Sequence, residues 1–252
     1  MKPEELLELQ SALVTCLTDP GALSEFRAGA AAWEKLSFLD PELMELMSSL
    51  CHGKRLDKLN KILPMTLAHL APEMGELAHE FMRRHPPRNS DSYTNACQFY
   101  GFLRRRWRHH PPDPPFLPDL AYCELARISL ERQTVSGVPA VLQSLATPAQ
   151  PSILIRRRNG IRLHRCQYDV QPLFEHEGHD GAAIAPIPVC VVLSQPLASS
   201  SGKMFCVDPQ LFGMLQGLRG WTAVSLASEQ TVTFLRHLEE LGFLEVQICG
   251  SQ

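Results

Sequence analysis

Residues 203–248 read KMFCVDPQLFGMLQGLRGWTAVSLASEQTVTFLRHLEELGFLEVQI, and this stretch decides the fold of the C-terminal half. Asp208 is followed by Pro209, a pair typical of a helix N-cap and the first helical position. Ser228 is a second candidate N-cap, because the residues after it repeat apolar side chains at helical spacing. The stretch therefore predicts two capped helices.

The segments around those helices complete the pattern. Residues 204–207 are expected to form a strand, and residues 221–226 a short helix or turn between the two capped helices. Gly242 is expected to end the last helix, since glycine readily adopts the left-handed conformation found there. Residues 244–248 alternate apolar and polar side chains, which indicates a closing strand. Strands, three short helices and a final strand are typical of a winged helix-turn-helix.

Upstream of this stretch the sequence predicts a linker and then more strands. Residues 147–151 are rich in proline and small side chains, as linkers are. Asn159-Gly160 is a dipeptide typical of a tight hairpin turn, and a polar loop is expected over residues 175–188. The expected strands are 153–155, 161–164 and 189–193.

The N-terminal part shows the helical spacing of apolar side chains. Asp40 before Pro41 is a candidate N-cap, and the apolar residues that follow predict a core-facing helix ending at Gly53. These apolar residues are Leu43, Leu46, Met47 and Leu50. Further helices are expected at roughly 4–17, 21–36, 55–70, 73–84, 91–108 and 118–133.

The predicted fold class is therefore α+β. An N-terminal helical bundle domain would occupy residues 1–145, and a strand-rich, winged-helix-like domain would occupy residues 151–252. A chain of 252 residues is long enough for two small domains or one large one.

Composition limits the classes of function. The net charge of −3 argues against a chain built to coat nucleic acid. Eight cysteines occur without any CxxC pair, so a zinc ribbon or a dithiol redox site is not indicated. The sequence has no signal-peptide pattern and no apolar run of membrane-spanning length, which favours a cytoplasmic location and no membrane partner.

Two local clusters could suggest ligands. The segment His176-Glu177-Gly178-His179 looks like a metal motif, but its spacing and its glycine do not suit a zinc-binding helix. A solvated loop is the preferred interpretation, and no metal site is predicted in this chain. From Arg83 to Arg108 there are seven arginines and one acid. We favour an interface with an acidic protein surface over nucleic acid for this cluster, with a solvated helical face as a further alternative.

A winged-helix domain commonly binds either DNA or an extended peptide. The expected third helix, residues 228–241, carries three carboxylates and one arginine, which would repel phosphate. Addition of a peptide strand to an open sheet edge is therefore favoured. The candidate peptide-binding residues are Val191, Leu193, Met204, Phe205, Leu235 and Leu238. No catalytic residue is predicted, since no nucleophile elbow, phosphate loop or paired-acid site occurs.

The most specific motif lies in the helical part. It begins with Phe81-x-x-x-His-Pro-Pro-Arg88, passes through an aromatic helix and reaches Phe116-Leu-Pro-Asp-Leu-Ala121, with Glu124 three residues on. This order resembles the small partner proteins of multinuclear-iron, TIM-barrel peptide-modifying enzymes, such as those of methanobactin and 3-thiaglutamate biosynthesis. One departure is Leu125, where that family often has an aromatic residue.

The resemblance implies a division of labour. The partner would hold the iron and perform an oxygen-dependent rearrangement of a cysteine in a ribosomally made precursor or carrier peptide, with 3-thiaglutamate-type β-carbon excision favoured. This chain would bind the peptide and dock on the barrel without a cofactor of its own. The candidate partner-interface residues are His85, Arg88, Arg104, Arg105, Trp107 and Arg108. The alternative function is a winged-helix DNA-binding transcriptional regulator.

Overall fold

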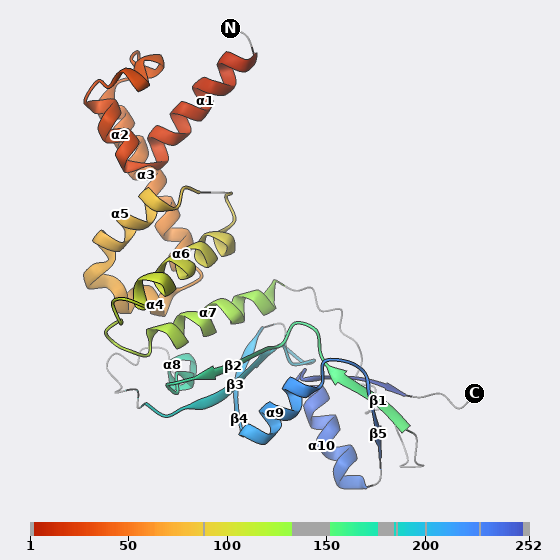
Figure 1. Ribbon diagram of the computed structural model, residues 1–252. Helices are drawn as coiled ribbons and strands as arrows, with labels where there is room; N and C mark the ends of the chain where they lie inside the picture. The colour runs from red at the N-terminus through yellow and green to blue at the C-terminus, as the bar shows by residue number, and fades with distance from the viewer. Residues whose placement is uncertain are drawn as a thin grey trace. The chain divides into compact units, whose positions relative to one another are not determined.

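The computed structural model of the chain describes residues 3–87, 89–132, 152–175, 184, 186–199, 201–226 and 228–248 (Figure 1). The chain divides into two compact units, residues 1–117 and residues 118–252. The first unit is helical, and the second combines helices with two three-stranded antiparallel sheets. The predicted linker over residues 147–151 lies outside the described residues.

Aspartate side chains cap three of the helices described in unit 1. Asp19, Asp40 and Asp91 are N-caps whose carboxylates accept hydrogen bonds from backbone N–H groups of the first turn. The elements are α1 (Pro3–Thr18), α2 (Pro20–Arg27), η1 (Ala31–Leu36), α3 (Pro41–Asn60), α4 (Pro64–Leu70), η2 (Ala71–Glu73), α5 (Met74–Arg84) and α6 (Ser92–Trp107). The N-cap predicted at Asp40 is therefore confirmed.

The apolar face predicted for α3 is wrong. Leu43, Leu46, Met47 and Leu50 are 43–56% exposed, whereas Met44, Ser48, Arg55 and Leu59 are buried. The buried side chains recur at intervals of four and seven residues along a different side of the helix, because α3 packs against α1, α2 and α6 on that side. The predicted end at Gly53 is also wrong, since the helix runs on to Asn60 and absorbs the modest cost of an internal glycine.

Arg55 shows how that side of α3 is held. Its guanidinium donates to Asn95 Oδ1 at 3.0 Å and to Gln98 Oε1 at 3.2 Å, and it lies 4.4 Å from the centroid of the Phe81 ring. Burial lowers the pKa of Arg55 to about 10. A buried cation thus links α3 to α5 and α6 through amide oxygens and an aromatic face.

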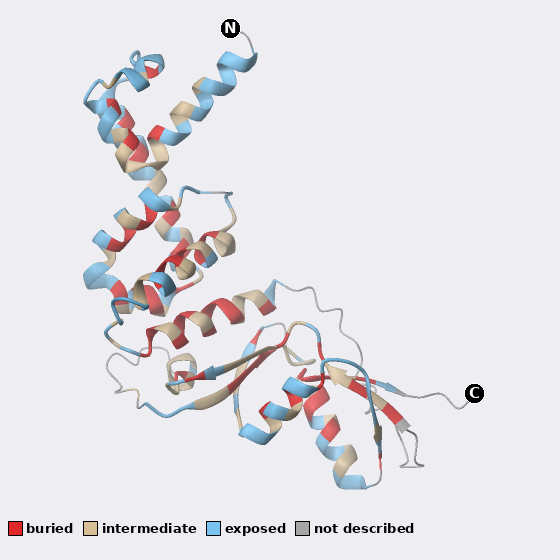
Figure 2. Ribbon diagram, viewed as in Figure 1, coloured by how far each residue is buried: buried red, intermediate tan, exposed pale blue. Residues whose placement is uncertain are grey.

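Unit 2 places its strands in two separate sheets, in the orders β5-β1-β6 and β2-β3-β4. The strands are β1 (Ser152–Arg157), β2 (Arg162–Cys166), β3 (Val189–Ser194), β4 (Lys203–Val207), β5 (Thr222–Ser225) and β6 (Leu244–Ile248). The helices are α7 (Leu117–Glu131), α8 (Gln171–Glu175), α9 (Pro209–Gly217) and α10 (Glu229–Glu240). Figure 2 shows that α7 is buried along most of its length.

The turn at Asn159-Gly160 is present, with Gly160 at φ +97°, but the hairpin predicted around it is wrong. Strand β1 pairs with β5 on one side and β6 on the other, while β2 pairs with β3. Both edges of β1 are therefore occupied by strands from the end of the chain. The turn redirects the chain from one sheet to the other.

The helix or turn predicted over residues 221–226 is replaced by strand β5, which pairs with β1. Thr222 and Val224 are β-branched, and pairing with β1 favours the extended form that such residues prefer. Because β5 and β6 both run antiparallel to β1, helix α10 connects two parallel strands with β1 between them, a split βαβ unit. The predicted series of three short helices is thus wrong in its second member.

The caps, the helix end and the closing strand predicted within residues 203–248 are confirmed, whereas the polar loop expected over residues 175–188 lies largely outside the described residues. The Asp208 carboxylate accepts from the N–H groups of Gln210 and Leu211, and the Ser228 hydroxyl accepts from the N–H of Thr231. Gly242 ends α10 at φ +73°. The core includes Ile153, Ile155, Val192, Leu215, Leu235, Leu238 and Phe243. In the described part of the chain, no helix is long and apolar enough to cross a membrane.

Candidate functional site

Unit 1 has a cationic cavity at the C-terminal ends of α5 and α6, and we call it the basic pocket. Its volume is about 820 Å³. The lining residues are Glu80, Arg84, His85, Phe102, Arg105, Arg106, Arg108, His109 and His110. Four arginines and three histidines therefore face a single carboxylate.

The carboxylate of the basic pocket is already shared between two arginines. Glu80 lies 3.1 Å from Arg84 Nη1 and 2.8 Å from Arg106 Nη1. Arg105 Nη2 lies 3.0 Å from His85 Nε2, and because a guanidinium can only donate, this ring nitrogen is the acceptor. Within the described residues, Arg105 and Arg108 have no carboxylate partner. The pocket is left with uncompensated positive charge.

The predicted partner-interface residues are only partly gathered there. His85, Arg105 and Arg108 line the basic pocket. Arg104 lies over the Tyr100 ring, 5.7 Å from its centroid, and it does not line the pocket among the described residues; nor does Trp107. Arg88 lies outside the described residues. The prediction of a partner interface stays a prediction.

The predicted peptide-binding residues lie on two faces of the β2-β3-β4 sheet. Phe205 is opposite Val192 in the ladder and packs on the core that contains Leu235 and Leu238. Residues directly opposite in a ladder share a face, and neighbours along a strand point to opposite faces. Val191, Leu193 and Met204 therefore share the other face with His164 and Arg162. The structure brings together three of the six residues and separates the other three from them.

Burial further restricts what these residues can contact. Val191, Leu193, Leu235 and Leu238 are at most 4% exposed, so they are core residues in this structure. Met204 and Phe205 on strand β4 are partly exposed, and Lys203 and Cys206 are exposed. A role in peptide binding stays a prediction, and β4 is the part of the set that a peptide can reach.

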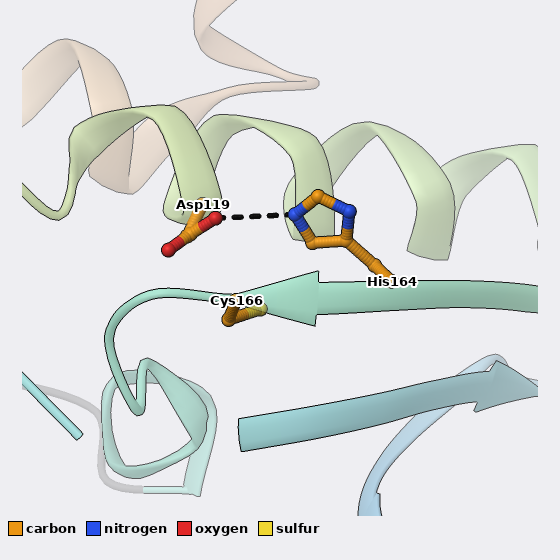
Figure 3. Close-up of side chains that lie close together, drawn as sticks. All are labelled: Asp119, His164 and Cys166. Atoms are coloured by element: carbon orange, nitrogen blue, oxygen red, sulfur yellow. Dashed lines mark hydrogen bonds and ion pairs between the residues drawn. The ribbon is translucent and has the colours of Figure 1, made fainter. Parts of the chain in front are cut away.

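A third cluster was not predicted from the sequence. Asp119 on α7 and His164 and Cys166 on β2 have nitrogen, oxygen and sulfur atoms that all lie within 4.8 Å of one another. Figure 3 shows the three side chains converging between the helix and the strand. Asp119 and Cys166 are buried, and His164 is partly exposed.

Asp119 joins helix α7 to the end of strand β2. Its Oδ1 lies 3.1 Å from His164 Nε2, while its Oδ2 accepts from the backbone N–H of Gln167 at 2.7 Å and of Tyr168 at 3.2 Å. The ring of Tyr122, one turn along α7, stacks on the imidazole with a centroid distance of 4.0 Å. The carboxylate thus fixes the histidine ring and the turn that follows β2.

A second thiol lies beside the cluster. Cys123 is fully buried on α7, beside the thiol of Cys166. The neighbouring Cys166 thiol and burial raise the pKa of the Cys123 thiol. The arrangement combines an oriented imidazole, a carboxylate and two thiols, which are groups that can hold a soft or borderline metal ion.

The sequence alone relates only two of the three residues of this cluster to each other. The His-x-Cys spacing of His164 and Cys166 places both side chains on one face of a strand. Asp119 is 45 residues upstream of His164, and only the fold brings it into contact. The segment considered for metal binding, His176–His179, lies outside the described residues.

Comparisons with known proteins do not identify these sites. No protein-family model matches the chain, and no curated protein matches it.

Proposed function

We propose that this chain is a peptide-binding, non-catalytic subunit of an iron-dependent oxidative complex. It would bind a ribosomally made precursor or carrier peptide and present the cysteine of that peptide to a TIM-barrel partner that holds the iron. Excision of the cysteine β-carbon, as in 3-thiaglutamate biosynthesis, is the favoured reaction. The proposal starts from the resemblance of residues 81–124 to such partner subunits.

The structural observation that carries the proposal is the open edge of strand β4. Among the described strands, β4 pairs with β3 alone, so one row of its backbone N–H and C=O groups has no partner strand. Such a row is a template for an added strand. The partly exposed Met204 and Phe205 would then contact alternate side chains of the peptide on the two faces.

The basic pocket supports the second half of the proposal. Its uncompensated arginines suit an acidic surface, because guanidinium groups bind carboxylates through paired hydrogen bonds. Charges of this kind mainly accelerate association and select the partner. We assign the docking of the partner subunit to this pocket, and the binding of peptide to β4.

Helix α10 gives little support to the alternative function as a DNA-binding regulator. Its exposed positions include Glu229, Gln230, Phe234 and His237. A helix that enters the major groove needs cationic and amide side chains on that surface. A monomeric chain that binds duplex DNA with strong salt dependence would contradict our proposal.

The experiment is co-expression with the proposed partners, a TIM-barrel protein and a precursor peptide sought among the neighbouring genes. We expect a stable complex, and binding of the fluorescently labelled peptide measured by anisotropy. Proline is placed at Met204 and at Phe205 in two variants, because neighbouring residues direct their N–H groups to opposite sides of a strand. In one of the two variants, the lost N–H is one that points away from β3 to the open edge, and this variant should fold.

The folded β4 variant should bind the peptide at least about tenfold more weakly, through the lost N–H and the distorted edge. The matched controls are Ala223→Pro and Val224→Pro on β5, which is also an edge strand. Equal loss of affinity in the folded β5 variant, or full affinity in the folded β4 variant, would contradict the assignment of β4.

A further inference from the structure

We propose that Asp119, His164 and Cys166 form a binding site for a divalent transition-metal ion, with zinc the expected occupant. This inference is independent of the proposed function. It concerns the cluster drawn in Figure 3, in which a helix and a strand supply one carboxylate, one imidazole and one thiol.

The spacing of the three groups suits tetrahedral coordination. Zinc binds nitrogen and oxygen at about 2.0–2.2 Å and sulfur at about 2.3 Å, so its ligand atoms lie roughly 3.3–3.7 Å apart. His164 Nε2 and Asp119 Oδ1 are already 3.1 Å apart, and all three ligand atoms lie within 4.8 Å of one another. An ion could replace the hydrogen bond between imidazole and carboxylate with shifts of a few tenths of an ångström in those two groups and of up to about 1 Å in the Cys166 sulfur.

The hydrogen bonds of Asp119 leave the required oxygen available. The two backbone N–H groups of Gln167 and Tyr168 both bind Oδ2, whereas the imidazole is the one hydrogen-bond partner of Oδ1 among the described residues. The carboxylate can therefore bind an ion through Oδ1 while Oδ2 keeps its orientation. Such support of a ligand by neighbouring hydrogen bonds is a regular feature of metal sites.

Two further side chains support the site from outside. The Tyr122 ring stacks on the imidazole and restricts its rotation. Cys123 is buried beside Cys166, where its S–H could donate to a metal-bound thiolate. These contacts fix the ligand directions before an ion arrives. The fourth coordination position is left for water, on the side where His164 is partly exposed.

The donor set decides which ion is expected. A thiolate and an imidazole exclude Mg²⁺ and Ca²⁺, which prefer oxygen ligands only. Zinc accepts nitrogen, sulfur and oxygen together and has no redox chemistry that would endanger adjacent thiols.

The test uses the full-length, untagged chain, so that no polyhistidine tag competes for the metal. After incubation with Zn²⁺ and gel filtration, we expect about one zinc ion per chain by mass spectrometry of the metal. Replacement by Co²⁺ should give a thiolate-to-cobalt charge-transfer band. A wild-type chain that retains no zinc, or that binds Co²⁺ without this band, would overturn the proposal whatever the variants do.

The variants His164→Gln and Cys166→Ser should weaken zinc binding by about a hundredfold or more. Cys190→Ser is the matched control, because Cys190 is on β3, opposite Arg165 in the ladder, and thus on the other face of the same sheet. Circular dichroism checks that all three variants fold. Retention of zinc by both site variants would place the ion elsewhere and contradict the assignment.

Discussion

The basic pocket of unit 1 and the Asp119 cluster of unit 2 are built in opposite ways. The pocket gathers charged side chains from one short stretch, Glu80–His110, at the exposed ends of two helices. The cluster joins Asp119 to residues 45 and 47 positions further along the chain, and two of its three side chains are buried. One site is local and exposed, and the other is long-range and enclosed.

This difference determines what each site contributes to stability. Exposed charges interact weakly with one another through solvent, so the residues of the basic pocket are available for a ligand at little cost to folding. Buried polar groups that satisfy one another are part of the fold, because removal of one leaves the others without partners. Mutations should therefore separate the proposed recognition surface in unit 1 from a structural junction in unit 2.

The largest effect is expected for Asp119→Ala. The substitution leaves the His164 imidazole and the N–H groups of Gln167 and Tyr168 without their acceptor. We expect the free energy of unfolding of the metal-free protein to fall by about 4 kcal/mol. Urea denaturation followed by circular dichroism measures this change.

The control for that prediction is Asp208→Ala. Asp208 also accepts from two backbone N–H groups, but it is exposed, so water can replace its carboxylate. A loss of about 1 kcal/mol is expected, as for other N-caps. If the two variants lose the same stability, the Asp119 cluster is not the buried junction described above.

A smaller effect is expected from two glycines with the same role in the two units. Gly29 and Gly242 both follow a helix with positive φ, +71° and +73°. A Cβ at Gly29 meets nothing within 4 Å, whereas at Gly242 it would lie 2.3 Å from the carbonyl oxygen of Gln195. Gly29→Ala should cost about 1 kcal/mol for the left-handed backbone alone. Gly242→Ala should cost about 3 kcal/mol, because the backbone near Gln195 must also move.

The two alanine variants are compared by thermal denaturation, and hydrogen exchange locates the destabilised segment. Exchange should increase around β6 and α10 in Gly242→Ala, and only at the end of α2 in Gly29→Ala. Equal losses of stability would mean that the segment around Gln195 yields easily. Tight packing in unit 2 would then be limited to the Asp119 cluster.

Features of the fold that depend on neighbouring residues were predictable. The N-caps at Asp40, Asp208 and Ser228 and the helix end at Gly242 need only local hydrogen bonds and backbone conformations. Strands were also predicted at the positions of β1, β2, β3, β4 and β6, because apolar residues recur along each of these segments. The class of mixed helix and sheet, with a mostly helical N-terminal part, follows from the same signals.

Features that depend on distant partners were not predictable. The apolar stripe of α3 has helical spacing, yet Leu43 and Leu50 are exposed while Arg55 is buried. A stripe predicts a helix face and does not say which face its neighbours will cover. Strand β5 was missed for a related reason, since its extended form depends on pairing with β1, about seventy residues upstream.

The same distinction separates the two candidate sites. The arginines between Arg83 and Arg108 were noticed because charge runs are visible in a sequence, and three of the six interface candidates line the basic pocket. Asp119 belonged to the motif that identified the resemblance, but nothing in the sequence connected it with His164. Long-range contacts of single polar residues leave no periodic pattern.

The smallest effect on stability is expected in the basic pocket. Substitutions there give the sharpest test of the difference between this pocket and the Asp119 cluster. Arg105→Gln and Arg108→Gln together remove two charges that have no carboxylate partner among the described residues. The free energy of unfolding should change by less than about 0.5 kcal/mol, because only exposed interactions, such as that of Arg105 with His85, are lost. Association with the proposed TIM-barrel partner should slow by about tenfold at low salt and approach the wild-type rate at high salt.

Stopped-flow fluorescence measures the rate of association, and Arg27→Gln, which removes an exposed ion pair with Glu45, is the control. A large loss of stability would make the pocket part of the fold, and an unchanged rate would remove it from the docking surface.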